Sequence, residues 1–413
     1  MPTRRGWALF GGSLALGVGG RLLGVFDLFA LAAASFALAV AGLVYVRMTR
    51  FRLEAVRELR PARVHAGSPS RVELSVRNVA PTRSPVLTAR DPFDGGKRWA
   101  RFLLAPLGPG ETARAAYRLP TDERGIYDLG PLQLALSDPF GVAAAAFPAA
   151  AATKLTVYPR TDRIAPLPLS RGNDPHAGAD HPTALSLAGE DFYALRQYED
   201  GDDPRRVHWG ATAKMDELMV RQDEMPWQGR ATVLLDVRRG VHTPASLELA
   251  VSAAASIVSA CWERRSLVRL VTTSGFDSGF AAGARHVEAI LEHLAVVQTE
   301  RGTHVLPVLA RLGRQASGGS MAMVTTSAAT DADLGGVARL SERYGFVALV
   351  LFERSAFDPT TAGQQLAPRS VPSLGTVVRV TGLRPFAAAW EQAIVPSYGS
   401  GRPTRPVPRV ARR

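Results

Sequence analysis

Acidic, basic and aromatic side chains are densely interleaved in one stretch of the sequence, residues 188–225. It holds two adjacent carboxylates, Asp202 and Asp203, followed closely by Arg206 and His208. Paired carboxylates can act as general acid and base, and histidine can transfer protons near neutral pH. The same residues also suit a structural role, in which the aspartates cap a turn and pair with neighbouring arginines. Both interpretations stay open, and the structural one is favoured.

Local patterns predict the elements that position these residues. Apolar side chains recur at a spacing of three over residues 192–198, which indicates a short helical or turn segment. Residues 201–204, Gly-Asp-Asp-Pro, are typical of a turn. Apolar and polar residues then alternate over 207–211, as in a half-buried strand, and again over 218–220. We expect the aromatic side chains of Tyr198 and Trp209 to pack the stretch against the domain that follows it.

The stretch resembles the signature of the domain-of-unknown-function 58 family. That signature reads here as Leu195-Arg196-Gln197-Tyr198, Gly201-Asp202-Asp203, Arg206-Val207-His208-Trp209 and Leu218-Met219-Val220-Arg221. One departure is Gly210, where a basic residue is usual in the family. The resemblance implies a membrane hairpin, a β-rich domain, the signature itself and a von Willebrand factor A-like domain.

The resemblance also implies a function. It points to a partner, a MoxR-type AAA+ ATPase, and to roles in complex assembly or cell-envelope biogenesis. The signature residues expected to bind a partner are Arg196, Tyr198, Gly201, Asp202, Asp203, Arg206, His208, Trp209 and Arg221. The alternative is an enzyme or a nucleotide- or phosphate-binding protein that uses Asp202, Asp203, Arg206 and His208.

Two apolar runs, residues 7–25 and 28–46, are broken only by Arg21 and separated by Asp27. Each approaches the roughly 20 residues needed to cross a bilayer. A signal peptide is the alternative for the first run, but no Ala-x-Ala-like site follows it directly and a second apolar run does. We therefore expect a transmembrane helical hairpin that contacts the lipid bilayer through residues 7–46. Arginines at its outer flanks predict a multi-pass cell-membrane protein with the bulk of the chain in the cytoplasm.

From about residue 54 to residue 158 the pattern changes to the period-two alternation of strands, clearest at residues 71–77. Short strands separated by turn residues at this interval predict a β-sandwich. The alanine-rich run 143–152 is expected to form a weak edge strand. The Asp-Pro-Phe-Gly turn at residues 138–141 is either a structural corner, which we favour, or a tip that docks a partner.

Residues 161–187 are rich in proline and glycine and poor in apolar side chains, which predicts an exposed linker. Strand-like runs then alternate with helical patterns, which predicts a doubly wound, mostly parallel α/β sheet. The predicted fold class is multi-domain: a transmembrane helical hairpin at 1–52, a β-sandwich-like domain at 53–160, a linker at 161–187, the signature at 188–228, a von Willebrand A-like α/β domain at 229–396 and a disordered basic tail at 397–413.

A von Willebrand A domain usually binds Mg²⁺ through Asp-x-Ser-x-Ser after its first strand, a threonine from a second loop and an aspartate after its fourth strand. Here the first motif reads Asp236-Val237-Arg238-Arg239-Gly240, so that only the aspartate remains. The second loop is supplied by Thr272-Thr273-Ser274, and the fourth-strand loop is followed by Asp331. We therefore expect a degenerate metal site at Asp236 and Thr272, no bound Mg²⁺, and an ion pair between Asp236 and Arg238 or Arg239.

Complete catalytic motifs are missing from the sequence: it has no phosphate loop, no His-Glu-x-x-His and no Gly-x-Ser-x-Gly. The single cysteine, Cys261, lies on the apolar face of a predicted helix and is expected to be a core thiol. The net charge is +12, but part of the excess lies in the terminal segments, so we do not expect nucleic-acid binding. The sequence thus favours an interaction protein without a cofactor over an enzyme.

Overall fold

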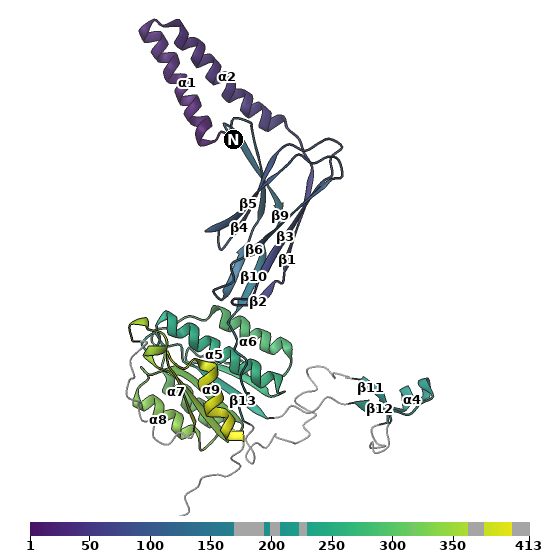
Figure 1. The fold of residues 1–413 in the computed structure, drawn as a ribbon, viewed down its shortest axis with the longest axis vertical. Helices are drawn as coiled ribbons and strands as arrows, with labels where there is room; N and C mark the ends of the chain where they lie inside the picture. The colour runs from purple at the N-terminus through teal and green to yellow at the C-terminus, as the bar shows by residue number, and fades with distance from the viewer. Residues whose placement is uncertain (169–193, 199–206, 223–228, 317, 362–375, 399–413) are drawn as a thin grey trace, which may run out of the picture. The chain divides into compact units, whose positions relative to one another are not determined.

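The computed structural model describes residues 1–168, 194–198, 207–222, 229–316, 318–361 and 376–398 (Figure 1). The chain divides into two compact units, Met1–Pro159 and Arg160–Arg413. The predicted tail beyond residue 398 and most of the predicted linker lie outside the described residues.

The first unit begins with two helices packed against each other, α1 (Arg4–Leu23) and α2 (Phe26–Met48). The hydroxyl of Thr3 caps α1 by accepting a bond from the backbone N–H of Gly6 at 3.1 Å. Gly24, with φ +68°, ends the helix in the left-handed conformation that glycine adopts without steric cost. The predicted apolar helix pair is therefore present, with bounds close to those expected.

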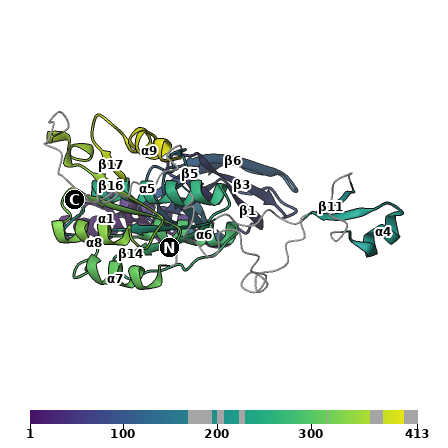
Figure 2. The same cartoon turned by 90° about the horizontal axis from the view of Figure 1, so that it is seen from below.

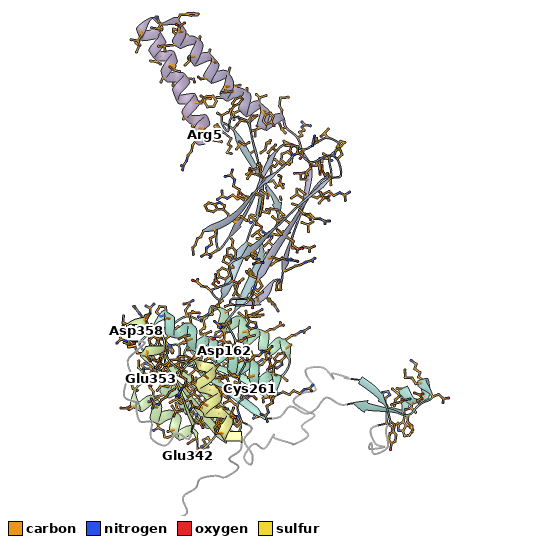
Figure 3. All side chains as sticks on the ribbon, viewed as in Figure 1. Arg5, Asp162, Cys261, Glu342, Glu353 and Asp358 are labelled. Carbon is orange, nitrogen blue, oxygen red and sulfur yellow. The ribbon has the colours of Figure 1, made fainter. Side chains whose placement is uncertain are left out.

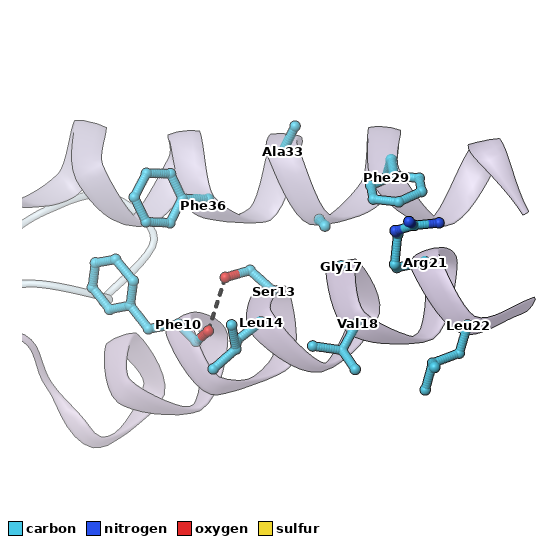
Figure 4. Close-up of a pocket in the computed structure, with 11 residues that line it drawn as sticks. Phe10, Ser13, Leu14, Gly17, Val18, Arg21, Leu22, Phe29, Ala33 and Phe36 are labelled. Carbon is cyan, nitrogen blue, oxygen red and sulfur yellow. Dashed lines mark hydrogen bonds between the residues drawn. The ribbon is translucent and has the colours of Figure 1, made fainter. Parts of the chain in front are cut away.

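An open groove runs between these two helices (Figure 4). Phe10 and Phe36 face each other across it with ring centroids 5.8 Å apart in an edge-to-face arrangement. The groove is apolar apart from Ser13, whose hydroxyl donates to the carbonyl of Phe10 at 2.8 Å, and Arg21. The lining of this groove is therefore compatible with contact to apolar groups along most of its length.

Among the helices of the described segments, α2 and α5 (Pro244–Glu263) are long and apolar enough to cross a bilayer. They differ in burial: α5 is mostly buried inside the second unit, as a core helix is, whereas α2 is mostly exposed. The glycine-rich α1 falls outside this group, so length and composition support only one of the two expected spans. Membrane association therefore fits α2 best by composition and exposure.

Two β-sheets form the rest of the first unit. One sheet has the order β1-β3-β6, and the other β2-β10-β7-β4-β8-β9, with β5 paired to β4. The strands are β1 (Leu53–Arg60), β2 (Arg63–His65), β3 (Ser70–Asn78), β4 (Leu87–Phe93), β5 (Arg98–Leu104), β6 (Thr112–Leu119), β7 (Gly125–Leu129), β8 (Leu132–Ser137), β9 (Ala144–Ala150) and β10 (Thr153–Tyr158). Buried side chains of both sheets share one hydrophobic core, as in a sandwich. The alanine-rich run forms β9 at a sheet edge, as predicted.

A charged network is buried in this sandwich. Arg57 and Asp91 form an ion pair at 2.6 Å, and their side chains are 1% and 0% exposed. The hydroxyl of Tyr117 donates to the second carboxylate oxygen of Asp91 at 2.7 Å, and Arg57 also donates to the carbonyl of Leu129 at 3.1 Å. Burial, and then the bond to Asp91, raise the pKa of Tyr117 far above its usual value. The network joins β1, β4 and β6, which sequence patterns alone do not pair.

The second unit contains a five-stranded, all-parallel sheet in the order β14-β13-β15-β16-β17. Its elements are β13 (Arg230–Leu235), α5, β14 (Leu267–Thr272), α6 (Ala284–Val296), α7 (Val305–Gln315), β15 (Ser320–Thr326), α8 (Asp331–Leu340), β16 (Phe346–Phe352), β17 (Thr376–Val380) and α9 (Phe386–Ile394), with single-turn helices at Arg354–Ala356, Pro359–Thr361 and Val395–Tyr398. The doubly wound α/β prediction is confirmed at this level, although α7 was not predicted.

Helices cover both faces of this sheet. Helices α7 and α8 lie side by side in both views (Figures 1 and 2) and share a core with alternate residues of the strands. Helix α5 packs on β13, β14 and β15 from the opposite face. Pro244 at its start and the reciprocal capping bonds between Thr243 and Ser246 explain why α5 begins there.

The predicted linker is wrong at its beginning, because residues 160–168 pack on the α/β core. The backbone N–H of Asp162 donates to Ser256 at 2.9 Å, and the indole of Trp390 donates to the carbonyl of Ala165 at 2.7 Å. The N–H of Leu167, a buried residue, donates to the sulfur of Cys261 at 3.5 Å. Figure 3 labels Asp162 and Cys261 in this unit. Burial raises the pKa of Cys261 to about 12, so the thiol is inert core, as expected.

Candidate functional site

The carboxyl edge of the parallel sheet carries the first candidate site. Strands β14 and β15 flank β13 on opposite sides, so the chain changes direction across β13. Open α/β sheets bind ligands at such a switch point, beyond the carboxyl ends of the strands. Asp236 lies there directly after β13; it is fully buried, and its N–H donates to the carbonyl of Val324 at 3.0 Å.

The guanidinium of Arg238 occupies the centre of this site. Its Nε donates to Oδ1 of Asp236 at 2.9 Å, and its Nη2 donates to Oδ2 at 2.8 Å. The same Nη2 donates to Oδ2 of Asp333 at 3.0 Å. The hydroxyl of Thr325 donates to Oδ2 of Asp236 at 2.9 Å, and that of Thr273 lies 3.4 Å from Oδ1. One arginine thus joins two carboxylates from separate loops.

Electrostatics in this cluster follow from burial and from these bonds. Burial alone lowers the pKa of Arg238, but the bonds and charges of Asp236 and Asp333 outweigh it and raise the pKa above its usual value. Burial alone raises the pKa of Asp333, but bonds from Thr330 and then Arg238 lower it on balance. Burial lowers the pKa of His242, whose Nδ1 lies 3.2 Å from the hydroxyl of Ser246. The cluster therefore holds a permanent cation beside a neutral imidazole at pH 7.

The residues at this edge do not fit a divalent cation. Mg²⁺ requires several oxygen ligands in near-octahedral geometry. Both carboxylate oxygens of Asp236 already accept bonds from Arg238, and the guanidinium carries its positive charge into the space between Asp236 and Asp333. Among the described residues, no three His, Cys, Asp or Glu side chains come together in a group that could hold a metal. A bound ion at this position would have to displace Arg238.

The sequence predicted part of this site. The ion pair between Asp236 and Arg238 was one of the two expected pairings. The expectation for Thr272 is wrong, because its hydroxyl bonds to Ser274 at 2.7 Å while Thr273 reaches Asp236.

The aspartate that completes the cluster after β15 is Asp333 rather than the expected Asp331. Thr330 and Asp333 form the reciprocal capping bonds that start α8, and this Thr-x-x-Asp spacing was a usable sequence signal.

The signature forms a second candidate site, a small hairpin of β11 (Ala194–Gln197) and β12 (Met219–Gln222) with helix α4 (Trp209–Met215) between them. Two local predictions are wrong: residues 194–197 form a strand rather than a helical turn, and residues 209–211 begin a helix rather than a strand. The helix begins at Trp209 because His208 caps α4: its Nδ1 accepts a hydrogen bond from the backbone N–H of Ala211 at 3.0 Å. The N–H of His208 donates to Met219 at 2.7 Å, which ties the helix to β12.

The signature hairpin separates buried from exposed apolar residues. Val207 and Met219 are buried, whereas Trp209, Met215 and Leu218 are 69%, 63% and 47% exposed. The packing of Tyr198 and Trp209 against the α/β domain stays a prediction. Of the other predicted residues, Tyr198 donates its backbone N–H to Leu218 at 2.8 Å. Gly201, Asp202, Asp203 and Arg206 lie outside the described residues, and Arg196 and Arg221 are described only as strand backbone.

Comparison with known proteins identifies the family. Residues 194–355, which span the signature hairpin and most of the α/β sheet, match the model of the family described as "Protein of unknown function DUF58". This match confirms the resemblance to the family over residues 194–355, and α2 fits membrane association. No curated protein matches it.

Solved structures resemble only part of the chain. The CARDB domain of a Pyrococcus furiosus protein is 17% identical, with 26% of this chain and 93% of that chain covered and a TM-score of 0.20. The putative ApaA protein of Bordetella pertussis is 15% identical, with 26% and 96% covered and a TM-score of 0.20. A β-glucosidase of Erythrobacter marinus is 16% identical, with 26% and 15% covered and a TM-score of 0.18. Similarities this low carry no argument about function.

Proposed function

We propose that this chain is a membrane-anchored interaction protein whose hairpin α1–α2 spans the membrane with both ends in the cytoplasm. Its signature hairpin and α/β domain bind a cytoplasmic protein there. The partner that the family resemblance favours is a MoxR-type AAA+ ATPase acting in complex assembly or envelope biogenesis.

The observation that carries this proposal is the exposure of Trp209 within the family signature. Large aromatic side chains dominate the binding energy of protein interfaces when a partner buries them. Trp209 and Met215 stand at the two ends of α4, and both are exposed, while Val207 and Met219 supply the interior of the signature hairpin. An aromatic residue that the hairpin does not need for its own core is available to a partner.

The cluster around Arg238 supports binding without a metal. We propose that the α/β domain is a degenerate von Willebrand A-like domain in which a side-chain cation replaces the divalent ion. The side chain of Arg238 then holds the loops at the switch point in one arrangement, because it bonds to both Asp236 and Asp333. Partner binding therefore does not depend on the concentration of a metal ion.

The alternative, an enzyme or phosphate-binding protein using Asp202, Asp203, Arg206 and His208, has weaker support. Nδ1 of His208 accepts a bond from the backbone of α4, so the ring has a structural use. No observation in the described part of the chain favours a reaction at this position.

A pull-down with the purified full-length protein tests the proposal. The bait is a purified MoxR-type AAA+ ATPase, and the variants are Trp209→Ala and, as a matched exposed control on the same helix, Met215→Ala. We expect Trp209→Ala to weaken binding at least tenfold without changing the melting temperature, and Met215→Ala to have a smaller effect. If Trp209→Ala lowers the melting temperature and reduces binding only in proportion, Trp209 packs inside the chain and this proposal is wrong.

A further inference from the structure

The Asp-Pro-Phe-Gly turn at residues 138–141 is held rigidly by its own aspartate. Oδ2 of Asp138 accepts from the N–H of Phe140 at 2.9 Å, and Oδ1 accepts from the N–H of Ala143 at 2.5 Å. Gly141, at φ +70°, bonds back to the carbonyl of Asp138 at 3.0 Å. Asp138 is buried, yet Phe140 at the tip is 62% exposed. The turn therefore presents an aromatic ring from a rigid base.

The start of the chain bonds to this turn. The N–H of Thr3 donates to the carbonyl of Val142 at 2.9 Å, and its hydroxyl donates to the carbonyl of Gly141 at 2.7 Å. Met1 and Ala144 exchange two further bonds, at 2.8 Å and 3.0 Å. The turn is thus joined to the residues that enter α1.

Helix α2 contacts the same turn from its second half. A Cβ placed on Gly42 would lie 2.6 Å from a methyl carbon of Val142 and 3.2 Å from the carboxyl carbon of Asp138. The space that a side chain at position 42 would occupy is therefore filled by the turn. Because both α1 and α2 contact the turn, the position of Phe140 along the helix axes is fixed relative to the ends of the two helices.

Basic residues gather at those helix ends. Arg4 and Arg5 begin α1, and Arg47, Arg50 and Arg52 follow the end of α2; all of them are exposed. Arg5 lies beside the turn, with Nη1 3.7 Å from the position of a Cβ on Gly141. Asp138, the carboxylate within the turn, is buried and uses both oxygens in backbone bonds. We call these arginines and the turn 138–141 the basic collar.

We propose that the basic collar is a binding surface for anionic phospholipid headgroups, with the ring of Phe140 inserted at the membrane interface. This inference rests on the proposed membrane anchor formed by α1 and α2. Charge complementarity selects the ligand, because clustered arginines beside a membrane helix attract anionic lipids. Phe and Trp side chains of interfacial segments are buried at the boundary between headgroups and acyl chains, and the exposed Trp7 in the first turns of α1 adds a second aromatic ring. Binding at the collar fixes the β-sandwich relative to the bilayer.

Fluorescent labels on the full-length protein test this in nanodiscs. Phe140→Cys is labelled with an environment-sensitive dye, and the native Cys261 does not compete because it is buried. Ile126→Cys is the matched control: Ile126 is 45% exposed and pairs with Thr156 of β10. Thr156 also pairs with β2, which Figure 1 draws at the end of the sandwich away from α1 and α2. Val40→Cys on α2 reports whether the hairpin itself is inserted.

With phosphatidylglycerol in the nanodisc, we expect spin-labelled lipid to quench the dye at position 140 at least threefold more than the dye at position 126. The difference should shrink in pure phosphatidylcholine, in high salt, and in an Arg5→Gln/Arg50→Gln variant. If the dye at 140 is as exposed to water as that at 126 while the dye at 40 is in the lipid tails, the anchor stands and the collar proposal is wrong. Quenching at 140 that is independent of lipid charge contradicts the choice of anionic headgroups. If the dye at 40 is also in water, the membrane anchor itself fails, and the collar proposal with it.

Discussion

Nη2 of Arg238 lies 2.8 Å from Oδ2 of Asp236 and 3.0 Å from Oδ2 of Asp333, so one guanidinium joins the end of β13 to the start of α8. Metal-binding domains use a divalent ion to hold loops together in this way, and the ion can leave. Here the cation belongs to the chain. The loop after β13 and the N-terminal turn of α8 are therefore linked whenever the domain is folded, and loss of Arg238 leaves two carboxylates facing each other.

Replacing Arg238 with serine should lower the stability of the α/β domain and create affinity for divalent cations. Removing one partner of a nearly buried ion pair typically costs about 3–5 kcal/mol. Mg²⁺ or Mn²⁺ should then restore part of the loss, about 2.7 kcal/mol when its concentration is 100 times the dissociation constant. Thermal melts with and without the ion measure both effects.

The control for this prediction is Arg239→Ser, because Arg239 is the adjacent and exposed arginine. It should melt like the wild type and show no response to Mg²⁺. Adding Gly240→Ser to Arg238→Ser supplies a second hydroxyl, and nothing lies within 4 Å of the position of its Cβ. Micromolar Mg²⁺ binding by the unaltered protein, abolished by Asp236→Ala, would show that Arg238 does not exclude the ion.

Mild acid should destabilise the α/β domain through His242. Burial lowers the pKa of this histidine in the folded state, although the charge of Asp236 opposes the effect. In the unfolded chain the pKa is about 6.5. Between 6.5 and the lower native pKa, the unfolded chain binds a proton that the folded one does not, so the free energy of unfolding falls as pH falls. The slope is at most about 1.4 kcal/mol per pH unit for one histidine.

Denaturant titrations of the wild type and His242→Gln from pH 7.5 to pH 5 measure this slope. His293→Gln is a parallel variant, because burial also lowers the pKa of His293 and it contributes a separate part of the slope. Asp333 does not affect this measurement. Its pKa is lowered in the folded state, so its contribution to the free energy of unfolding is lost only below about pH 3.9, as the pH falls towards the pKa of the folded state. An unchanged slope in His242→Gln means that the histidine is not held neutral.

Periodicity predicted the α/β unit well because its elements are long and almost wholly buried. Every residue of β15 is buried, so its run of apolar residues stands out in the sequence. The amphipathic α7 (Val305–Gln315) was missed, although Val305, Val308, Leu309 and Leu312 recur with helical spacing. The N-terminal helices and the edge strand β9 were also predictable, because each has a distinct composition.

Contacts that depend on one atom were not predictable. The spacing of Thr272, Thr273 and Ser274 is equally compatible with any of them reaching Asp236, and in the structure it is the hydroxyl of Thr273 that lies 3.4 Å from Oδ1 of Asp236. The change from strand to helix at Trp209 depends on a capping bond to His208, an uncommon capping residue. Burial of Arg57 beside Asp91 depends on pairing between strands far apart in the chain.

The network in the β-sandwich predicts two graded effects. Asp91→Ala should cost about 3–5 kcal/mol, because it leaves the buried guanidinium of Arg57 without its counter-charge. Tyr117→Phe removes only one hydrogen bond to Asp91 and should cost about 1 kcal/mol. Chemical denaturation of residues 1–159 in the full-length protein, followed by a fluorescent label in the sandwich, measures both. Equal losses for the two variants would mean that the ion pair contributes nothing beyond the hydrogen bond.

Glycine at position 6 should be required to join the first helix to the sandwich. A Cβ on Gly6 would overlap the carbonyl oxygen of Val142, and this oxygen is backbone that also accepts the bond from Thr3. Gly6→Ala should therefore break the contact between the start of α1 and the turn 138–142. In detergent or nanodiscs, we expect faster proteolysis at residues 1–6 and a lower melting temperature.

Gly11→Ala is the matched control: nothing lies within 4 Å of its Cβ position, and alanine favours a helix interior by up to about 1 kcal/mol, so this variant should be neutral or more stable. If both variants behave alike, α1 is not held by the turn, and Phe140 has no fixed level at the membrane.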